Sequence, residues 1–77
     1  MPTDDKATWN YRVVEDTTQY GSVFTIYTVR YEGKKITSFC RDVPSGLSPE
    51  ELRGNLEQML QAFDLPVLSK RELDRIV

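Results

Sequence analysis

The sequence contains no histidine and only one cysteine, Cys40, among its 77 residues. Without histidine, neither a Ser-His-Asp nor a Cys-His catalytic site can form. A zinc site built from His and Cys ligands of one chain is excluded as well. A single cysteine also rules out an intramolecular disulfide and fits a reducing compartment. We therefore predict a non-enzymatic, cytoplasmic protein with no catalytic residue, no cofactor and no metal site.

Long apolar stretches and clustered positive charge are also missing. No segment approaches the roughly 20 consecutive apolar residues that a membrane helix needs, and residues 1–6 are polar and acidic, unlike a signal peptide. Ten basic and 12 acidic residues give a net charge of −2, which disfavours binding to nucleic-acid phosphates. Residues 1–8 lack periodicity and are interpreted as a mobile tail, followed by a single domain over residues 9–77.

Three strands are indicated in the first half of the chain. Residues 9–15 alternate apolar and polar side chains, and residues 23–31 are almost entirely β-branched or aromatic. A polar turn over residues 16–22 separates them, and Gly33 predicts a tight hairpin turn before a returning strand over residues 36–43. Pro44 ends that strand because proline cannot donate to a ladder. This order predicts an antiparallel meander.

A helix is indicated by a capping box at residues 48–51, Ser-Pro-Glu-Glu, with Leu47 and Leu52 placed to form a hydrophobic staple. The apolar positions share one helical face: Leu52, Leu56, Met59, Leu60 and Phe63. Pro66 predicts an end near residues 63–64. Gly54 is either tolerated within this helix or marks the close approach of another backbone. A second cap pattern at residues 69–72 predicts a short helical turn toward residue 77.

The predicted fold class is α+β, a three-stranded antiparallel meander packed against one amphipathic helix, with a short C-terminal helical turn. Both side-chain rows of the middle strand are apolar enough to be buried, and one helix covers only one of them. The C-terminal segment adds Leu65, Val67, Leu68, Leu73 and Ile76. These residues pack either on the open side of their own sheet or on a second copy of the protein.

This surplus of apolar surface predicts a protein-interaction module whose partner is an unknown protein or a second copy, giving a homodimer. The candidate interaction residues are Trp9, Tyr11, Tyr27, Tyr31, Cys40, Leu65, Leu68, Leu73 and Ile76. The alternative is a module that binds a ligand or single-stranded nucleic acid through exposed sheet aromatics. Core packing explains the same aromatics. Cys40 is either a small buried hydrophobe or a thiol activated by the neighbouring Arg41.

The order of these segments resembles a group of small uncharacterised bacterial proteins. The resemblance spans residues 9–68 and is carried by Trp-Asn-Tyr-Arg-Val-Val at 9–14, Ser-Pro-Glu-Glu-Leu at 48–52, Leu-Glu-Gln-Met-Leu-Gln-Ala-Phe at 56–63 and Pro-Val-Leu at 66–68. It implies no activity. The chain departs from the group at residues 39–46, where Cys40 and Arg41 replace expected acidic residues. The βββα order is also similar to the core of HicB-like antitoxins, which implies a protein partner.

Overall fold

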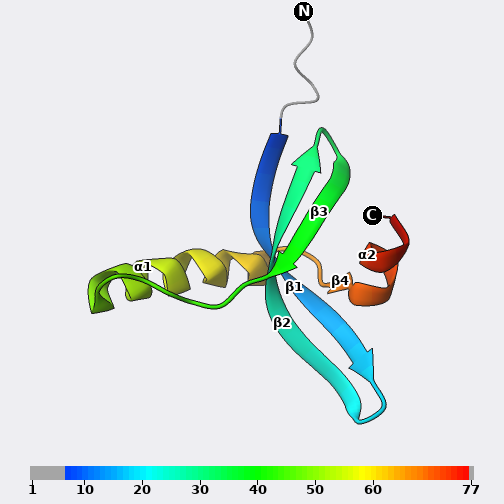
Figure 1. The fold of residues 1–77 in the computed structure, drawn as a ribbon, viewed down its shortest axis with the longest axis horizontal. Helices are drawn as coiled ribbons and strands as arrows, with labels where there is room; N and C mark the ends of the chain where they lie inside the picture. The colour runs from blue at the N-terminus through cyan, green and yellow to red at the C-terminus, as the bar shows by residue number, and fades with distance from the viewer. Residues whose placement is uncertain (1–6, 77) are drawn as a thin grey trace, which may run out of the picture.

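The computed structural model describes residues 7–76 and has an α+β architecture (Figure 1). Its elements are β1 (Ala7–Thr18), β2 (Gly21–Glu32), β3 (Lys35–Arg41), α1 (Pro49–Leu60), the 3₁₀-helix η1 (Gln61–Asp64), β4 (Leu68–Ser69) and α2 (Lys70–Ile76). The strands form one mixed sheet in the order β3-β2-β1-β4. No helix among these residues is long and apolar enough to cross a membrane.

The predicted meander is present, since β2 pairs antiparallel with both β1 and β3. The sheet also has a fourth strand that the sequence did not predict, because β4 has only two residues and shows no periodicity. It runs parallel to β1 and pairs Leu68 with Val14 and Ser69 with Glu15. The predicted three-stranded meander is therefore corrected to a four-stranded mixed sheet, whereas the predicted C-terminal helical turn is present as α2.

Two predicted boundaries also change. Strand β1 begins at Ala7, so residues 7 and 8 belong to the sheet, whereas residues 1–6 of the predicted tail lie outside the described residues. The first turn is much shorter than residues 16–22, because the strands continue to Thr18 and resume at Gly21. Gly21 has a φ of 120°, which favours glycine. The Thr18 hydroxyl donates to the Gly21 carbonyl at 2.8 Å and accepts from the Tyr20 amide at 3.1 Å.

Both faces of the sheet are covered near the middle of β1. Consecutive strand residues point to opposite faces, and Val13 and Val14 are both buried. On one face, Leu73 of α2 packs with Val14, Tyr27 and Val29, surrounded by half-buried Tyr31, Ile36, Phe39 and Leu68. Within the C-terminal segment, Leu73 and Leu68 thus pack on their own sheet, whereas Leu65, Val67 and Ile76 are exposed. On the other face, Met59 and Ala62 of α1 and η1 are buried.

The predicted helix start is confirmed. Ser48 has extended φ and ψ of −150° and 163°, its hydroxyl accepts from the Glu51 amide at 3.1 Å, and Pro49 occupies the first turn. The Glu51 carboxylate in turn accepts from the Leu47 amide at 3.5 Å. The predicted staple does not form, because Leu47 is 95% exposed. The end is confirmed, since η1 finishes at Asp64 and Leu65 is extended before Pro66.

The molecule is extended, and two arms project from the centre. The radius of gyration is 14.1 Å, compared with about 11 Å for a compact domain of this length. The first half of α1 projects to one side, and the β1–β2 hairpin projects beyond the ends of β3 and β4 (Figure 1). Much of α1 therefore lies away from the sheet that was expected to cover it.

Candidate protein-interaction surface

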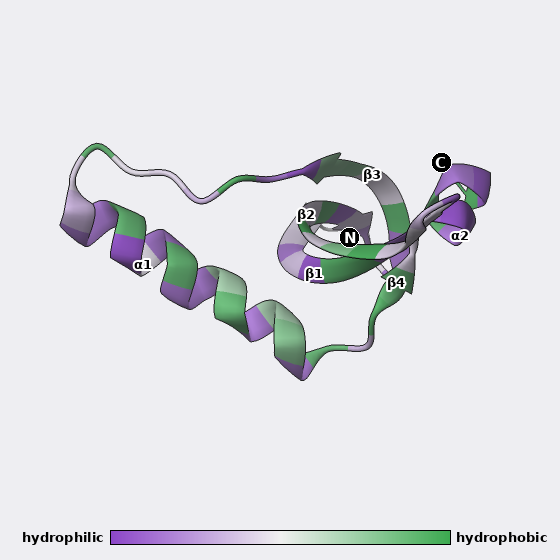
Figure 2. Cartoon of the chain, turned by 90° about the horizontal axis from the view of Figure 1, so that it is seen from below, coloured by the Kyte–Doolittle hydropathy of each residue, from purple (hydrophilic) through white to green (hydrophobic). Residues whose placement is uncertain are grey.

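The apolar stripe of α1 and η1 is largely exposed, although the sequence assigns it to the core. Leu56 is 44% exposed, Leu60 61% and Phe63 67%, and Leu52 is exposed as well. Of the predicted stripe, only Met59 is buried. Hydrophobic residues recur along the whole length of α1, including the part that projects beyond the sheet (Figure 2). Surfaces of this kind on a monomer mark interaction sites.

Strand β2 continues this exposed surface. Phe24 is more than half exposed, and it lines a groove of about 330 Å³ between β2 and α1. The groove is lined by Phe24, Thr25, Ile26, Asp42, Pro44, Leu56, Met59, Leu60 and Phe63. We call it the α1–β2 groove. All but two of its side chains are apolar, so it suits an apolar surface of another molecule rather than a polar reactant.

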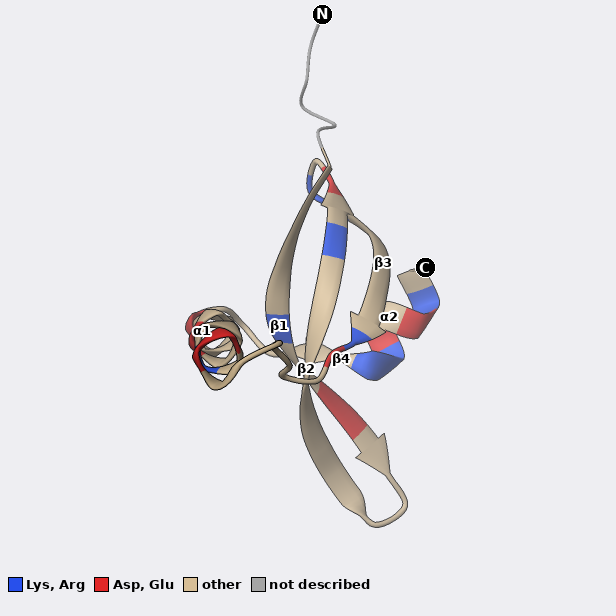
Figure 3. Ribbon diagram, turned by 60° about the vertical axis from the view of Figure 1, so that its left-hand side comes forward, with Lys and Arg blue, Asp and Glu red and all other residues tan. Residues whose placement is uncertain are grey.

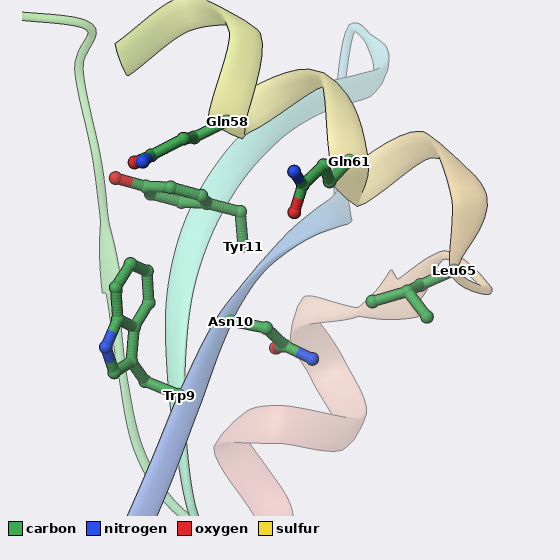
Figure 4. Close-up of a pocket in the computed structure, with 6 residues that line it drawn as sticks. All are labelled: Trp9, Asn10, Tyr11, Gln58, Gln61 and Leu65. Atoms are coloured by element: carbon green, nitrogen blue, oxygen red, sulfur yellow. The ribbon is translucent and has the colours of Figure 1, made fainter. Parts of the chain in front are cut away.

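A second cavity, of about 400 Å³, lies where β1 faces the end of α1 (Figure 4). Trp9 and Tyr11 meet there edge to face, with ring centroids 5.1 Å apart. The Tyr11 hydroxyl accepts from the Asn55 side chain at 3.1 Å, which fixes the ring against α1. The cavity is lined by Trp9, Asn10, Tyr11, Gln58, Gln61 and Leu65. We call it the Trp9–Tyr11 pocket; three amides and no charged side chain line it.

Among the candidate residues from the sequence, Trp9, Tyr11 and Leu65 thus come together in one pocket. Tyr27 and Leu73 are corrected from surface to core, because both are buried in the cluster beneath α2. The half-buried Leu68 packs against the same cluster, whereas Ile76 is exposed at the end of α2.

Tyr31 and Cys40 lie elsewhere on the sheet. The half-buried Tyr31 accepts a 2.9 Å hydrogen bond from Arg12, whose other terminal nitrogen donates to the Pro66 carbonyl at 2.6 Å. Arg12 therefore ties the β2 side of the sheet to the link before β4. Cys40 is exposed, which corrects the interpretation as a buried hydrophobe. Its thiol contacts only the Arg41 carbonyl at 3.5 Å among the described hydrogen-bonding groups.

The charged side chains of residues 7–76 are dispersed over several elements. Basic side chains are spread over the strands, the turn between β2 and β3, α1 and α2 (Figure 3). Among residues 7–76 the one ion pair joins Lys70 and Asp74 at 3.0 Å. The hydrogen bond from Lys70 to the Asp74 carboxylate raises the pKa of the lysine. Within the same residues, no group of three His, Cys, Asp or Glu side chains could hold a metal ion.

The sequence analysis missed the residues that dominate the exposed apolar surface, namely Phe24, Leu52, Leu56, Leu60 and Phe63. Their periodicity correctly indicates one helical face, but the same pattern serves a core or an interface. The available signal was the surplus of apolar rows on the middle strand, which includes Phe24.

A comparison with protein-family models, curated proteins and solved structures found no match to this chain.

Proposed function

We propose that this protein is a non-enzymatic interaction module that binds another protein chain through the α1–β2 groove. The observation that supports the proposal is the continuous exposed apolar surface formed by Phe24, Leu56, Leu60 and Phe63. Fully burying one such side chain contributes about 1.5–3 kcal/mol. These four side chains are now roughly half exposed. Burying them against a partner therefore supplies a binding free energy comparable with that of a protein interface.

The core of this protein is small, so burial of the exposed groove against a partner would add to its stability. Only seven hydrophobic residues are buried in the described part of the chain, and short domains commonly gain stability by association. The proposed partner is either a second copy or a different protein with an apolar recognition surface.

The test adds one charge inside the groove. Leu60→Glu places a carboxylate among apolar side chains, and Leu47→Glu makes the same substitution at an exposed position that lines neither the groove nor the Trp9–Tyr11 pocket. We expect the wild type and Leu47→Glu to retain a bound chain in sedimentation and affinity capture from the source cells, and Leu60→Glu to lose it. Equal binding by all three variants would contradict the proposal.

A second candidate function is binding of a small neutral ligand in the Trp9–Tyr11 pocket. The exposed Trp9 ring offers a stacking surface, and the amides of Gln58 and Gln61 offer hydrogen bonds beside it. No basic side chain lines the pocket, which favours a neutral ligand over single-stranded nucleic acid.

Trp9 is the only tryptophan of the chain, so its fluorescence reports on this pocket directly. Titration with a panel of neutral sugars and nucleosides, and with a short single-stranded oligonucleotide at low salt, should change the emission for the small neutral compounds alone. A salt-sensitive response to the oligonucleotide would instead favour the nucleic-acid alternative. An unchanged emission with every compound would remove this candidate.

A further inference from the structure

The exposed stripe of α1 lies beside the sheet rather than over it. At 100° per residue, Leu52, Leu56 and Leu60 fall within an arc of about 80° on α1, and the exposed Phe63 of η1 extends this stripe. The groups directed at the sheet border the stripe on one side: Met59 is buried, Asn55 bonds Tyr11, and Ala62 of η1 is buried as well. The chain therefore has a helix with one side on its own sheet and the adjacent side open to a neighbour.

We infer that this open side is covered by a second copy of the chain, whose α1 lies antiparallel to the first across a two-fold axis near Leu56. The inference rests on the proposed function and names its partner. In this arrangement Leu56 meets its own counterpart and Leu52 meets Leu60 of the second copy. The part of each stripe from Leu52 to Leu60 covers the same part of the other, with Phe63 beyond each end, and both copies use the same surface, as a closed two-fold dimer requires.

Charge complementarity favours the antiparallel direction. Arg53 and Glu57 border the stripe on the side away from the sheet, and neither forms an ion pair within residues 7–76. The two-fold axis brings these borders of the two helices together. Arg53 then lies about 3 Å along the helix axis from the level of Glu57 of the second copy, within reach of both side chains. Two symmetric ion pairs result.

A parallel pair lacks this complementarity. Its two-fold axis runs along the helices, so the border with Arg53 and Glu57 in one copy faces the sheet side of the other. Asn55 and Met59 occupy that side, and neither carries a charge. Both borders would then remain unpaired, which is why the charges select the antiparallel pair.

The first test is a charge exchange measured by sedimentation equilibrium. Arg53→Glu and Glu57→Arg each replace attraction by repulsion in both pairs, so each should weaken dimerisation by about tenfold or more at low salt. The double variant Arg53→Glu/Glu57→Arg restores opposite charges and should restore the dimer. Arg71→Glu, on α2, serves as the control with an unchanged dissociation constant. Failure of the double variant to recover would overturn the proposed pairing.

The second test determines whether the two α1 helices run antiparallel or parallel, and it uses disulfide formation in a Cys40→Ser background. A mixture of Leu52→Cys and Leu60→Cys chains should form the mixed disulfide under mild oxidation, and Leu52→Cys alone should not form a disulfide-linked dimer. The Cα atoms of facing positions fall within the span that a disulfide bridges, and those of the two residues 52 do not. Efficient self-linking of Leu52→Cys would show a parallel pair and overturn the inference.

The two proposals fail in different ways. A chain that stays monomeric at high micromolar concentration, yet loses a different captured protein on Leu60→Glu substitution, refutes the dimer and leaves the interaction module in place. A dimer that is insensitive to Leu60→Glu refutes the use of the groove, and with it both proposals.

Discussion

The two helices of this protein contribute to its core in inverse relation to their length. Helix α2 has seven residues, and its Leu73 is 1% exposed, packed among Val14, Tyr27 and Val29. Helix α1 has 12 residues and buries only Met59 within its own span. Amphipathic periodicity alone therefore does not decide whether a helix stabilises its own chain or presents a surface to another.

The connections explain the difference. Helix α2 follows β4 directly, and the pairing of β4 with β1 fixes where α2 begins. Helix α1 follows a link of residues 42–48, in which the Asp42 amide still donates to the Ile26 carbonyl at 3.1 Å. Beyond that bond the link leads away from the sheet, so the start of α1 lies well outside it (Figure 2).

The sharpest test of this comparison removes one leucine from each helix. Leu73→Ala should lower the free energy of unfolding by about 2–5 kcal/mol, because it leaves a cavity in the core. Leu60→Ala, the same chemical change at an exposed position, should lower it by less than about 1 kcal/mol at concentrations where the chain is monomeric. Urea unfolding followed by circular dichroism measures both values. Similar losses for the two variants would show that α1 packs on its own sheet as firmly as α2.

A smaller effect is expected where the link meets α1. A Cβ atom at Gly46 would lie 2.4 Å from the Leu52 amide nitrogen and 2.7 Å from the Glu51 carbonyl carbon. Both are backbone atoms, so the helix start or the link has to move, and Gly46→Ala should cost about 1–3 kcal/mol. Hydrogen exchange should locate the loss in the first turns of α1, with the amides beside Leu73 unchanged. Equal loss of protection in both helices would contradict the independence of α1 from the core.

Substitution of Gly54 by alanine should raise the stability, whereas substitution of Gly46 lowers it. Nothing lies within 4 Å of a Cβ atom placed there, so within the described chain no other backbone approaches this glycine. Gly54→Ala should therefore raise stability by up to about 1 kcal/mol through its higher helix propensity. Thermal unfolding over a range of concentrations measures the gain. A loss of stability that grows with concentration would instead place a second backbone against Gly54, the alternative left open by the sequence.

These comparisons show how far the sequence could predict the fold. The three long strands, the Ser48 cap and the end of the main helix before Pro66 follow from local patterns and were predicted correctly. Strand β4 could not be predicted, because a two-residue bridge depends on tertiary contact with β1. The burial of Leu73 and the exposure of Leu60 depend on where each connection carries its helix, and both residues have the same apolar periodicity. The residues of the α1–β2 groove were therefore not among the predicted interaction residues, whereas Trp9, Tyr11 and Leu65 were, and these line the Trp9–Tyr11 pocket.

The smallest expected effect concerns the one ion pair found within residues 7–76, which belongs to α2. The Lys70 ammonium lies 3.0 Å from Asp74 and 5.7 Å from the centre of the Phe39 ring, and the bond to Asp74 raises the lysine pKa above its ordinary 10.5. A raised lysine pKa means that this stabilisation is fully present below pH 10.5 and is lost as the pH rises through the folded-state value. Because the pair is exposed, salt should weaken it.

Lys70→Gln should therefore melt slightly below the wild type at neutral pH and low salt, and the difference should shrink above pH 10.5. Lys34→Gln, in the hairpin turn, removes the same charge without breaking an ion pair, so it corrects for the change in net charge. A difference between Lys70→Gln and Lys34→Gln that stays constant across the alkaline range would mean that packing of the lysine stem on Phe39, and not the ion pair, connects α2 to β3 at this point.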